Sequence, residues 1–142
     1  MAVPARTAPP RATFGRHERL RGRDAFDALF KDGLALNDAP LRLVGRFTEH
    51  PDGTPLRAAF VVPKRSVRLA SDRNRIRRQL REAFRLNKHG LNDRLRQAGL
   101  QVDWLFLWRS PKGPTRGESP QRILRLAERW LDRNLPTNTP SA

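Results

Sequence analysis

The sequence of 142 residues contains no cysteine and no tyrosine, and it has only 14 acidic residues against 29 lysines and arginines. The absence of cysteine excludes disulfide bonds, thiolate zinc sites and cysteine nucleophiles. No apolar run approaches the roughly 20 residues that a membrane-spanning helix needs. The N-terminus carries arginines but lacks the apolar stretch of a secretory signal. These absences favour a cytoplasmic protein that does not bind a membrane.

Residues that could perform catalysis are scattered along the chain. The acids show no Asp-x-Asp pair, and the three histidines have no metal-binding spacing. Two-metal cleavage requires several carboxylates close together, and a phosphate-binding Gly-x-x-x-x-Gly-Lys loop is absent as well. We therefore expect no catalytic residue and no metal ligand in this chain, and a protein-only nuclease is the least favoured class. If the chain belongs to an enzyme, the reacting groups lie in another molecule.

The formal net charge of +15 predicts a polyanionic partner. The charge is concentrated in Arg73–Leu86, which holds six arginines and one acid. Its apolar residues Ile76, Leu80, Ala83 and Phe84 recur at a spacing that places them on one side of a helix. The arginines on the remaining surface repel one another unless an anion lies between them, and a guanidinium can bind a phosphate with two hydrogen bonds. The segment therefore predicts a helix that binds a phosphate backbone.

The predicted bounds of this helix leave other classes of protein open. Ser71 or Asp72 is a suitable N-terminal cap, and Lys88–Gly90 is expected to break the helix before a short helical turn at Leu91–Gln97. Two helices separated by a break also suit a helix-turn-helix DNA-binding regulator. A ribosomal or RNA-chaperone protein, with the same charge but no defined cleft, is a further alternative.

The other elements are predicted from periodicity and from turn residues. A helix over Leu20–Lys31 carries Phe26, Leu29 and Phe30 on one face and stops at Gly33. Ser119 is expected to cap a last helix. Between these helices we expect a strand at residues 41–48, a turn at 51–54, a strand at 57–62 and a strand at 102–108, and the last helix has an apolar face of Ile123, Leu126, Ala127, Trp130 and Leu131.

This order predicts an α+β fold, a two-layer sandwich in which helices pack on a small, mostly antiparallel sheet. The elements run α-β-β-(β)-α-β-α, and strands 41–48 and 57–62 are expected to form an antiparallel hairpin. We expect a disordered basic arm over residues 1–15, a single RNA-binding domain over 16–135 and a disordered tail over 136–142.

Two consecutive segments carry a family resemblance. Phe60–Arg65 (FVVPKR), followed after a short basic link by Arg73–Arg85 (RNRIRRQLREAFR), resembles the protein subunit of bacterial ribonuclease P. Leu20–Gly33 and Asp103–Arg109 resemble the first helix and a later strand of that family. The resemblance implies an accessory subunit of an endonuclease in which a catalytic RNA, holding Mg²⁺, removes the 5′ leader of precursor tRNA. It also implies a left-handed crossover between parallel strands, which chirality rules alone do not favour.

The resemblance further implies the partners and the binding residues. The partners are one catalytic RNA per protein, in a 1:1 particle, and precursor tRNA. The leader cleft would be lined by Phe26 and Phe30, for which core packing is the alternative. Because the chain has no tyrosine, we expect leader stacking on the sheet either to be weaker than in the family or to shift to Phe47 or Phe60. The residues expected to contact RNA are Lys64, Arg65, Arg68, Arg73, Asn74, Arg75, Arg77, Arg78, Arg81 and Arg85.

Overall fold

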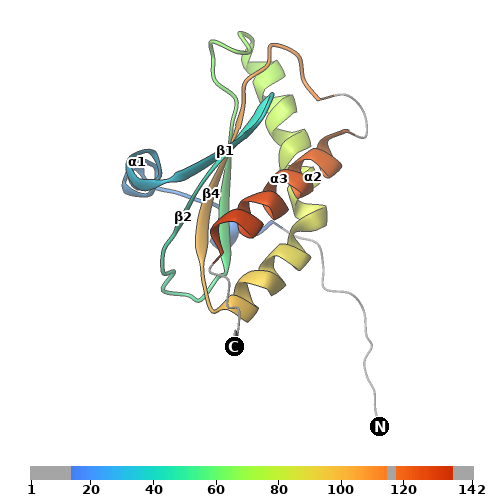
Figure 1. The fold of residues 1–142 in the computed structure, drawn as a ribbon. Coiled ribbons are helices and arrows are strands. Elements are labelled where there is room, and N and C mark those ends of the chain that lie inside the picture. The colour runs from blue at the N-terminus through green and yellow to red at the C-terminus, as the bar shows by residue number, and fades with distance from the viewer. Residues whose placement is uncertain (1–13, 115–117, 136–142) are drawn as a thin grey trace.

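The computed structural model describes residues 14–114 and 118–135. A short 3-10 helix, η1, precedes three α-helices and four strands (Figure 1). In chain order these elements are η1 (Arg16–Glu18), α1 (Arg23–Asp32), β1 (Leu34–Asp38), β2 (Leu41–Phe47), β3 (Leu56–Val61), α2 (Ala70–Ala98), β4 (Val102–Trp108) and α3 (Glu118–Asn134).

The four strands form one sheet in the order β1-β2-β4-β3. The pairs β1–β2 and β2–β4 are antiparallel, and β3 runs parallel to β4. The predicted hairpin of β2 with β3 is therefore wrong, because β4 lies between them. β4 takes the inner position because it is buried along both faces, as a nearly continuous apolar strand requires. The β3-α2-β4 connection joins parallel neighbours, and its left-handed sense stays a prediction.

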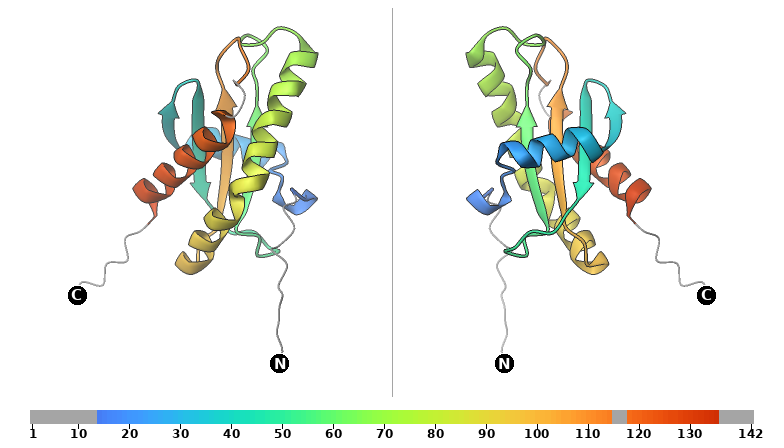
Figure 2. Two further views of the ribbon diagram at one scale, coloured as in Figure 1. Left: turned by 90° about the vertical axis from the view of Figure 1, so that its right-hand side faces the viewer. Right: turned by 90° about the vertical axis from the view of Figure 1, so that its left-hand side faces the viewer.

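Helices lie on both faces of the sheet (Figure 2). α2 and α3 cover one face, and α1 lies across the other. The larger core, which includes Phe60, Phe84 and Trp104, fills the α2–α3 side. A smaller cluster that includes Leu29 and Leu105 lies under α1. The predicted sandwich of sheet and helices is confirmed, and α1 adds a partial third layer on the opposite face.

α2 is one helix of 29 residues and passes through Gly90 without a break. The predicted break was wrong because Lys88, Leu91 and Leu95 all point into the protein and continue the buried face. Tertiary packing outweighs the roughly 1 kcal/mol that a glycine costs inside a helix. The helix ends at Gly99, which has the left-handed conformation with φ 70°. Without two separate helices in this region, the helix-turn-helix alternative loses its basis.

The start of α2 also differs from the prediction. The N-cap is Leu69, which makes no side-chain cap hydrogen bond, and both predicted caps, Ser71 and Asp72, lie inside the helix. The Arg73 guanidinium instead donates to the carbonyls of Val67 and Arg68, at 2.9 and 2.8 Å. These hydrogen bonds connect the segment before α2 to the first turn of the helix.

The predicted bounds need smaller corrections at the other helices. α1 begins at Arg23 rather than Leu20. α3 begins at Glu118, so Ser119 lies within the helix rather than before it. Phe14, which falls in the predicted disordered arm, packs against two rings of the core. Gly15, also in that arm, is the N-cap of η1. Residues 1–13 of the arm and the predicted tail, residues 136–142, lie outside the described residues.

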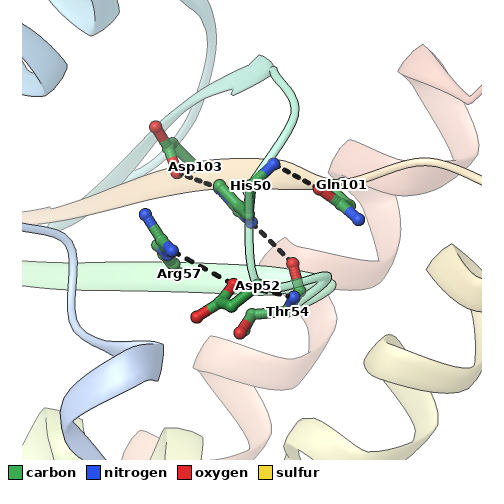
Figure 3. Close-up of polar contacts among 6 residues, drawn as sticks. All are labelled: His50, Asp52, Thr54, Arg57, Gln101 and Asp103. Atoms are coloured by element: carbon green, nitrogen blue, oxygen red, sulfur yellow. Dashed lines mark hydrogen bonds and ion pairs between the residues drawn. The ribbon is translucent and has the colours of Figure 1, made fainter.

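The β2–β3 connection is fixed to the sheet by His50 (Figure 3). Its Nδ1 lies 2.6 Å from the Thr54 carbonyl oxygen, and its Nε2 lies 2.7 Å from Asp103 Oδ1. The two ring nitrogens thus link the turn at Thr54 to Asp103 of β4. In the same turn the Thr54 backbone N–H donates to Asp52 and, together with the charge of Arg57, lowers the pKa of Asp52 to about 2. This cluster stabilises the connection.

The sequence predicts neither a metal ligand nor a membrane-spanning helix, and both predictions can be compared with the described residues. Residues 14–114 and 118–135 contain no group of three or more side chains suited to hold a metal ion. None of the helices in the same ranges is long and apolar enough to cross a membrane.

Candidate nucleic-acid interface

The six arginines between positions 73 and 85 of α2 occupy the helix surface that its buried residues leave uncovered, and we call this surface the arginine flank. Seven of the residues expected to contact RNA belong to this helix. Asn74, Arg75 and Arg78 are exposed. The four partly buried members are Arg73, Arg77, Arg81 and Arg85. The exposed flank is therefore lined by guanidiniums, as the periodicity of the segment predicts.

Several of these arginines have local partners. Arg75 lies 3.2 Å from Asp72, and Arg85 Nε donates to Glu82 at 2.9 Å. Arg77 donates to the side chain of Asn74. Solvent screens exposed pairs of this kind, and they contribute little to stability, so a phosphate can replace them at little cost.

Arg78 and Arg81 have no ion-pair partner within the described residues. Burial lowers the pKa of Arg81, and three neighbouring guanidiniums lower it further: those of Arg19, Arg77 and Arg78. Such a concentration of like charge is unfavourable in the free protein. An anion bound among these side chains would relieve the repulsion.

A groove of about 640 Å³ lies on the α1 side of the sheet. The end of α1 contributes Leu29 and Phe30 to its wall, and Phe30 is 68% exposed. Among the described residues, those that line the groove include no acid, and its cationic side chains are Arg42, Arg65 and Arg109. Arg65 belongs to the exposed link that also contains Lys64 and Arg68 and leads into α2. The groove and the arginine flank are thus joined by a basic segment.

The four phenylalanines predicted for the leader cleft occupy three different environments. Phe30 lines the groove, and Phe26 is partly buried in the cluster under α1. Phe47 packs on Trp130, and Phe60 lies in the larger core at 7% exposure, both on the opposite face of the sheet. Strand alternation explains this correction, since Phe47 shares the inward face of β2 with Leu41 and Leu43.

Three residues of these surfaces were not predicted as binding residues. Arg42 belongs to β2, and Arg109 follows β4 directly. Arg19 lies near the arginines of α2 although 62 residues separate it from Arg81. Alternation along the strand at residues 41–48 could have identified Arg42, because every second side chain of a strand lies on the same face. The positions of Arg19 and Arg109 follow from tertiary structure alone.

An arginine-lined helix flank and a basic groove with an exposed aromatic ring are features of an RNA-binding protein. The groove also disfavours the RNA-chaperone alternative, which predicts no defined cleft. Comparison with known proteins identifies the family. The family model for Ribonuclease P matches residues 14–116, and the chain belongs to the family of ribonuclease P protein components.

Individual relatives agree with this assignment. The ribonuclease P protein component of Porphyromonas gingivalis is 38% identical over 106 residues, which cover 71% of this chain and 74% of the relative. The Staphylococcus aureus ribonuclease P protein has a TM-score of 0.54 at 18% identity, covering 83% of this chain and 96% of that one. The Thermotoga maritima protein has a TM-score of 0.50 at 24% identity, covering 82% and 94%. At these identities the two structures support the fold.

The family places the chain in an endoribonuclease holoenzyme, as the protein partner of the ribonuclease P RNA. RNA binding and tRNA processing are the function of this family. The resemblance carried by the Arg73–Arg85 segment is thereby confirmed.

Proposed function

We propose that this chain binds the catalytic RNA through the arginine flank of α2 and holds the single-stranded leader of precursor tRNA in the groove beside Phe30. One protein would serve one RNA in the cytoplasm, and the Mg²⁺ ions of the reaction would be held by the RNA. The continuous basic surface from the groove through Arg65 to α2 is the observation that carries this proposal.

The chemical contribution of the protein is electrostatic. Two RNA molecules that approach each other repel through their phosphates, and a chain with a net charge of +15 placed between them reduces that repulsion. Water attack and metal chemistry would remain with the RNA. Contacts to backbone phosphates carry little sequence information, so leaders of different sequence can occupy the same groove.

The proposed RNA-binding flank is tested with Arg77→Ala combined with Arg81→Ala. The double variant should bind a bacterial catalytic RNA more weakly, and its plot of log affinity against log salt concentration should flatten by about 0.7–0.9 for each lost phosphate contact. Arg125→Ala with Arg129→Ala removes the same charge from the exposed surface of α3 and is the matched control. Equal flattening in both variants would contradict the assignment of the flank.

The same proteins allow a direct test of function. Wild-type protein added to the catalytic RNA at low Mg²⁺ should increase cleavage of precursor tRNA, and the α2 variant should increase it less. No gain with the wild-type protein would overturn the proposal.

Phe30→Ala tests the groove. Stacking of a base on an aromatic ring is worth about 1–3 kcal/mol, so the reconstituted particle should lose that much affinity for precursor tRNA and little for mature tRNA. Leu34→Ala, which removes another exposed apolar side chain that does not line the groove, is the control. An equal loss for both tRNAs would mean that Phe30 does not contact the leader.

A further inference from the structure

The N-terminal segment Phe14–Leu20 is docked on α2 and β3. The Phe14 ring contacts Phe84 of α2, with ring centroids 5.8 Å apart. Glu18 forms an ion pair with Lys88, and the two residues are only 8% and 3% exposed. The Leu20 N–H donates to the Ala58 carbonyl on β3 at 3.0 Å. Contacts near both ends therefore fix the position of the segment.

The docking places Arg19 beside the arginines of α2. Arg81, Phe84 and Lys88 are spaced at i, i+3 and i+7, so they lie on the same side of the helix. Phe14 contacts Phe84, and Glu18 contacts Lys88. The segment therefore lies along the side of α2 that also carries Arg81. The guanidinium carbon of Arg19 lies 5.7 Å from the centroid of the Phe14 ring, which supports the side chain from below.

The acids near this point are already paired. Glu18 is held by Lys88, and Glu82 is bound by Arg85. The Nε atom of Arg81 is buried and has no hydrogen-bond partner among the described residues. The neighbouring Arg78 is exposed and has no ion-pair partner in the same part of the chain. The guanidiniums of Arg19, from the N-terminal segment, and of Arg78 and Arg81, from α2, therefore lie near one another. No described acid forms an ion pair with Arg78 or Arg81.

We propose that Arg19 joins Arg78 and Arg81 in a composite site for one phosphodiester group of the bound RNA, and that the buried Glu18–Lys88 pair positions Arg19 for it. A phosphodiester has two free oxygens that accept hydrogen bonds, and guanidiniums from two sides can bind both. This inference rests on the proposed function, since it adds a residue from outside α2 to the surface that holds the catalytic RNA.

A double-mutant cycle tests whether Arg19 and Arg81 share a phosphate. Arg19→Ala, Arg81→Ala and the double variant are compared with wild type for affinity to a bacterial catalytic RNA. Groups that bind one phosphate are coupled, so the double variant should lose less affinity than the product of the two single losses, by about threefold or more. Arg21→Ala, which changes an exposed arginine directly after this segment, is the control and should combine multiplicatively with Arg81→Ala.

Glu18→Gln tests the positioning role. This variant keeps the size of the side chain but removes its charge, and it should weaken RNA binding as Arg19→Ala does. Combined with Arg19→Ala it should cause no further loss, a result that a merely structural defect would not produce. Melting curves establish that each variant is folded at the assay temperature.

The outcomes separate the two proposals. If wild type binds the RNA and Arg81→Ala weakens binding, but Arg19→Ala behaves like Arg21→Ala or the cycle is multiplicative, the composite site is wrong and the proposed function stands. A wild-type chain that fails to bind the catalytic RNA overturns both.

Discussion

Lys88→Met is expected to lower the free energy of unfolding by about 3–5 kcal/mol. The substitution leaves the carboxylate of Glu18 almost fully buried without its cationic partner, and breaking a buried ion pair from one side has a cost of this size. Urea unfolding at neutral pH measures the change as a lower midpoint at similar slope.

Two further variants define the origin of this effect. Glu18→Gln combined with Lys88→Met removes both charges, and because neutral residues of similar volume often replace a buried pair without loss, it should recover most of the stability. Lys31→Met removes an exposed lysine from α1 and should change the stability by about 0.5 kcal/mol or less. A double variant no more stable than Lys88→Met would show that the pair itself is not the cause.

The role of Lys88 illustrates what the sequence could not show. Lys88 precedes His89 and Gly90, and this local composition indicates the end of a helix. Its partner Glu18 is 70 residues earlier in the chain, and a buried lysine is acceptable only with such a partner. By contrast, Ile76, Leu80, Ala83 and Phe84 were predicted as the core face of α2, and all are buried, because helical periodicity is a local property.

In the sheet and in the binding surface too, local sequence patterns predict some features, and tertiary structure alone determines the others. Three of the strands were predicted from alternation or apolar runs, but no local signal states that β4 lies between β2 and β3. The predicted order allows a third strand before the long helix but gives it no residues; β1 could not be located because only Leu36 of its five residues is buried. In the binding surface, the exposed position of the arginines of α2 follows from their spacing relative to the apolar residues. Arg19 and Arg109 join this surface only through the fold, since both lie outside α2.

Trp130→Ala is the second variant with a large expected effect, a loss of about 3–5 kcal/mol of unfolding free energy. Trp130 of α3 is fully buried, and its ring centroid lies 5.3 Å from that of Phe47 and 5.6 Å from that of Trp104. Its Nε1 donates to the Leu34 carbonyl on β1 at 2.8 Å. Truncation removes this bond and leaves a cavity between α3 and the sheet. Chemical denaturation measures the loss.

A substitution at Gly45 tests whether the loss of unfolding free energy in Trp130→Ala comes from the packing of α3 on β2. A Cβ atom at position 45 would lie 2.4 Å from Cζ2 of Trp130 and 2.5 Å from Cδ1 of Trp104. Gly45→Ala should therefore destabilise the wild type, and it should cost less in the Trp130→Ala background because one of the two clashes is gone. An equal cost in both backgrounds would contradict this packing. Because α3 lies on the face of the sheet opposite the groove, folded Trp130→Ala protein should bind precursor tRNA in the reconstituted particle as well as wild type does.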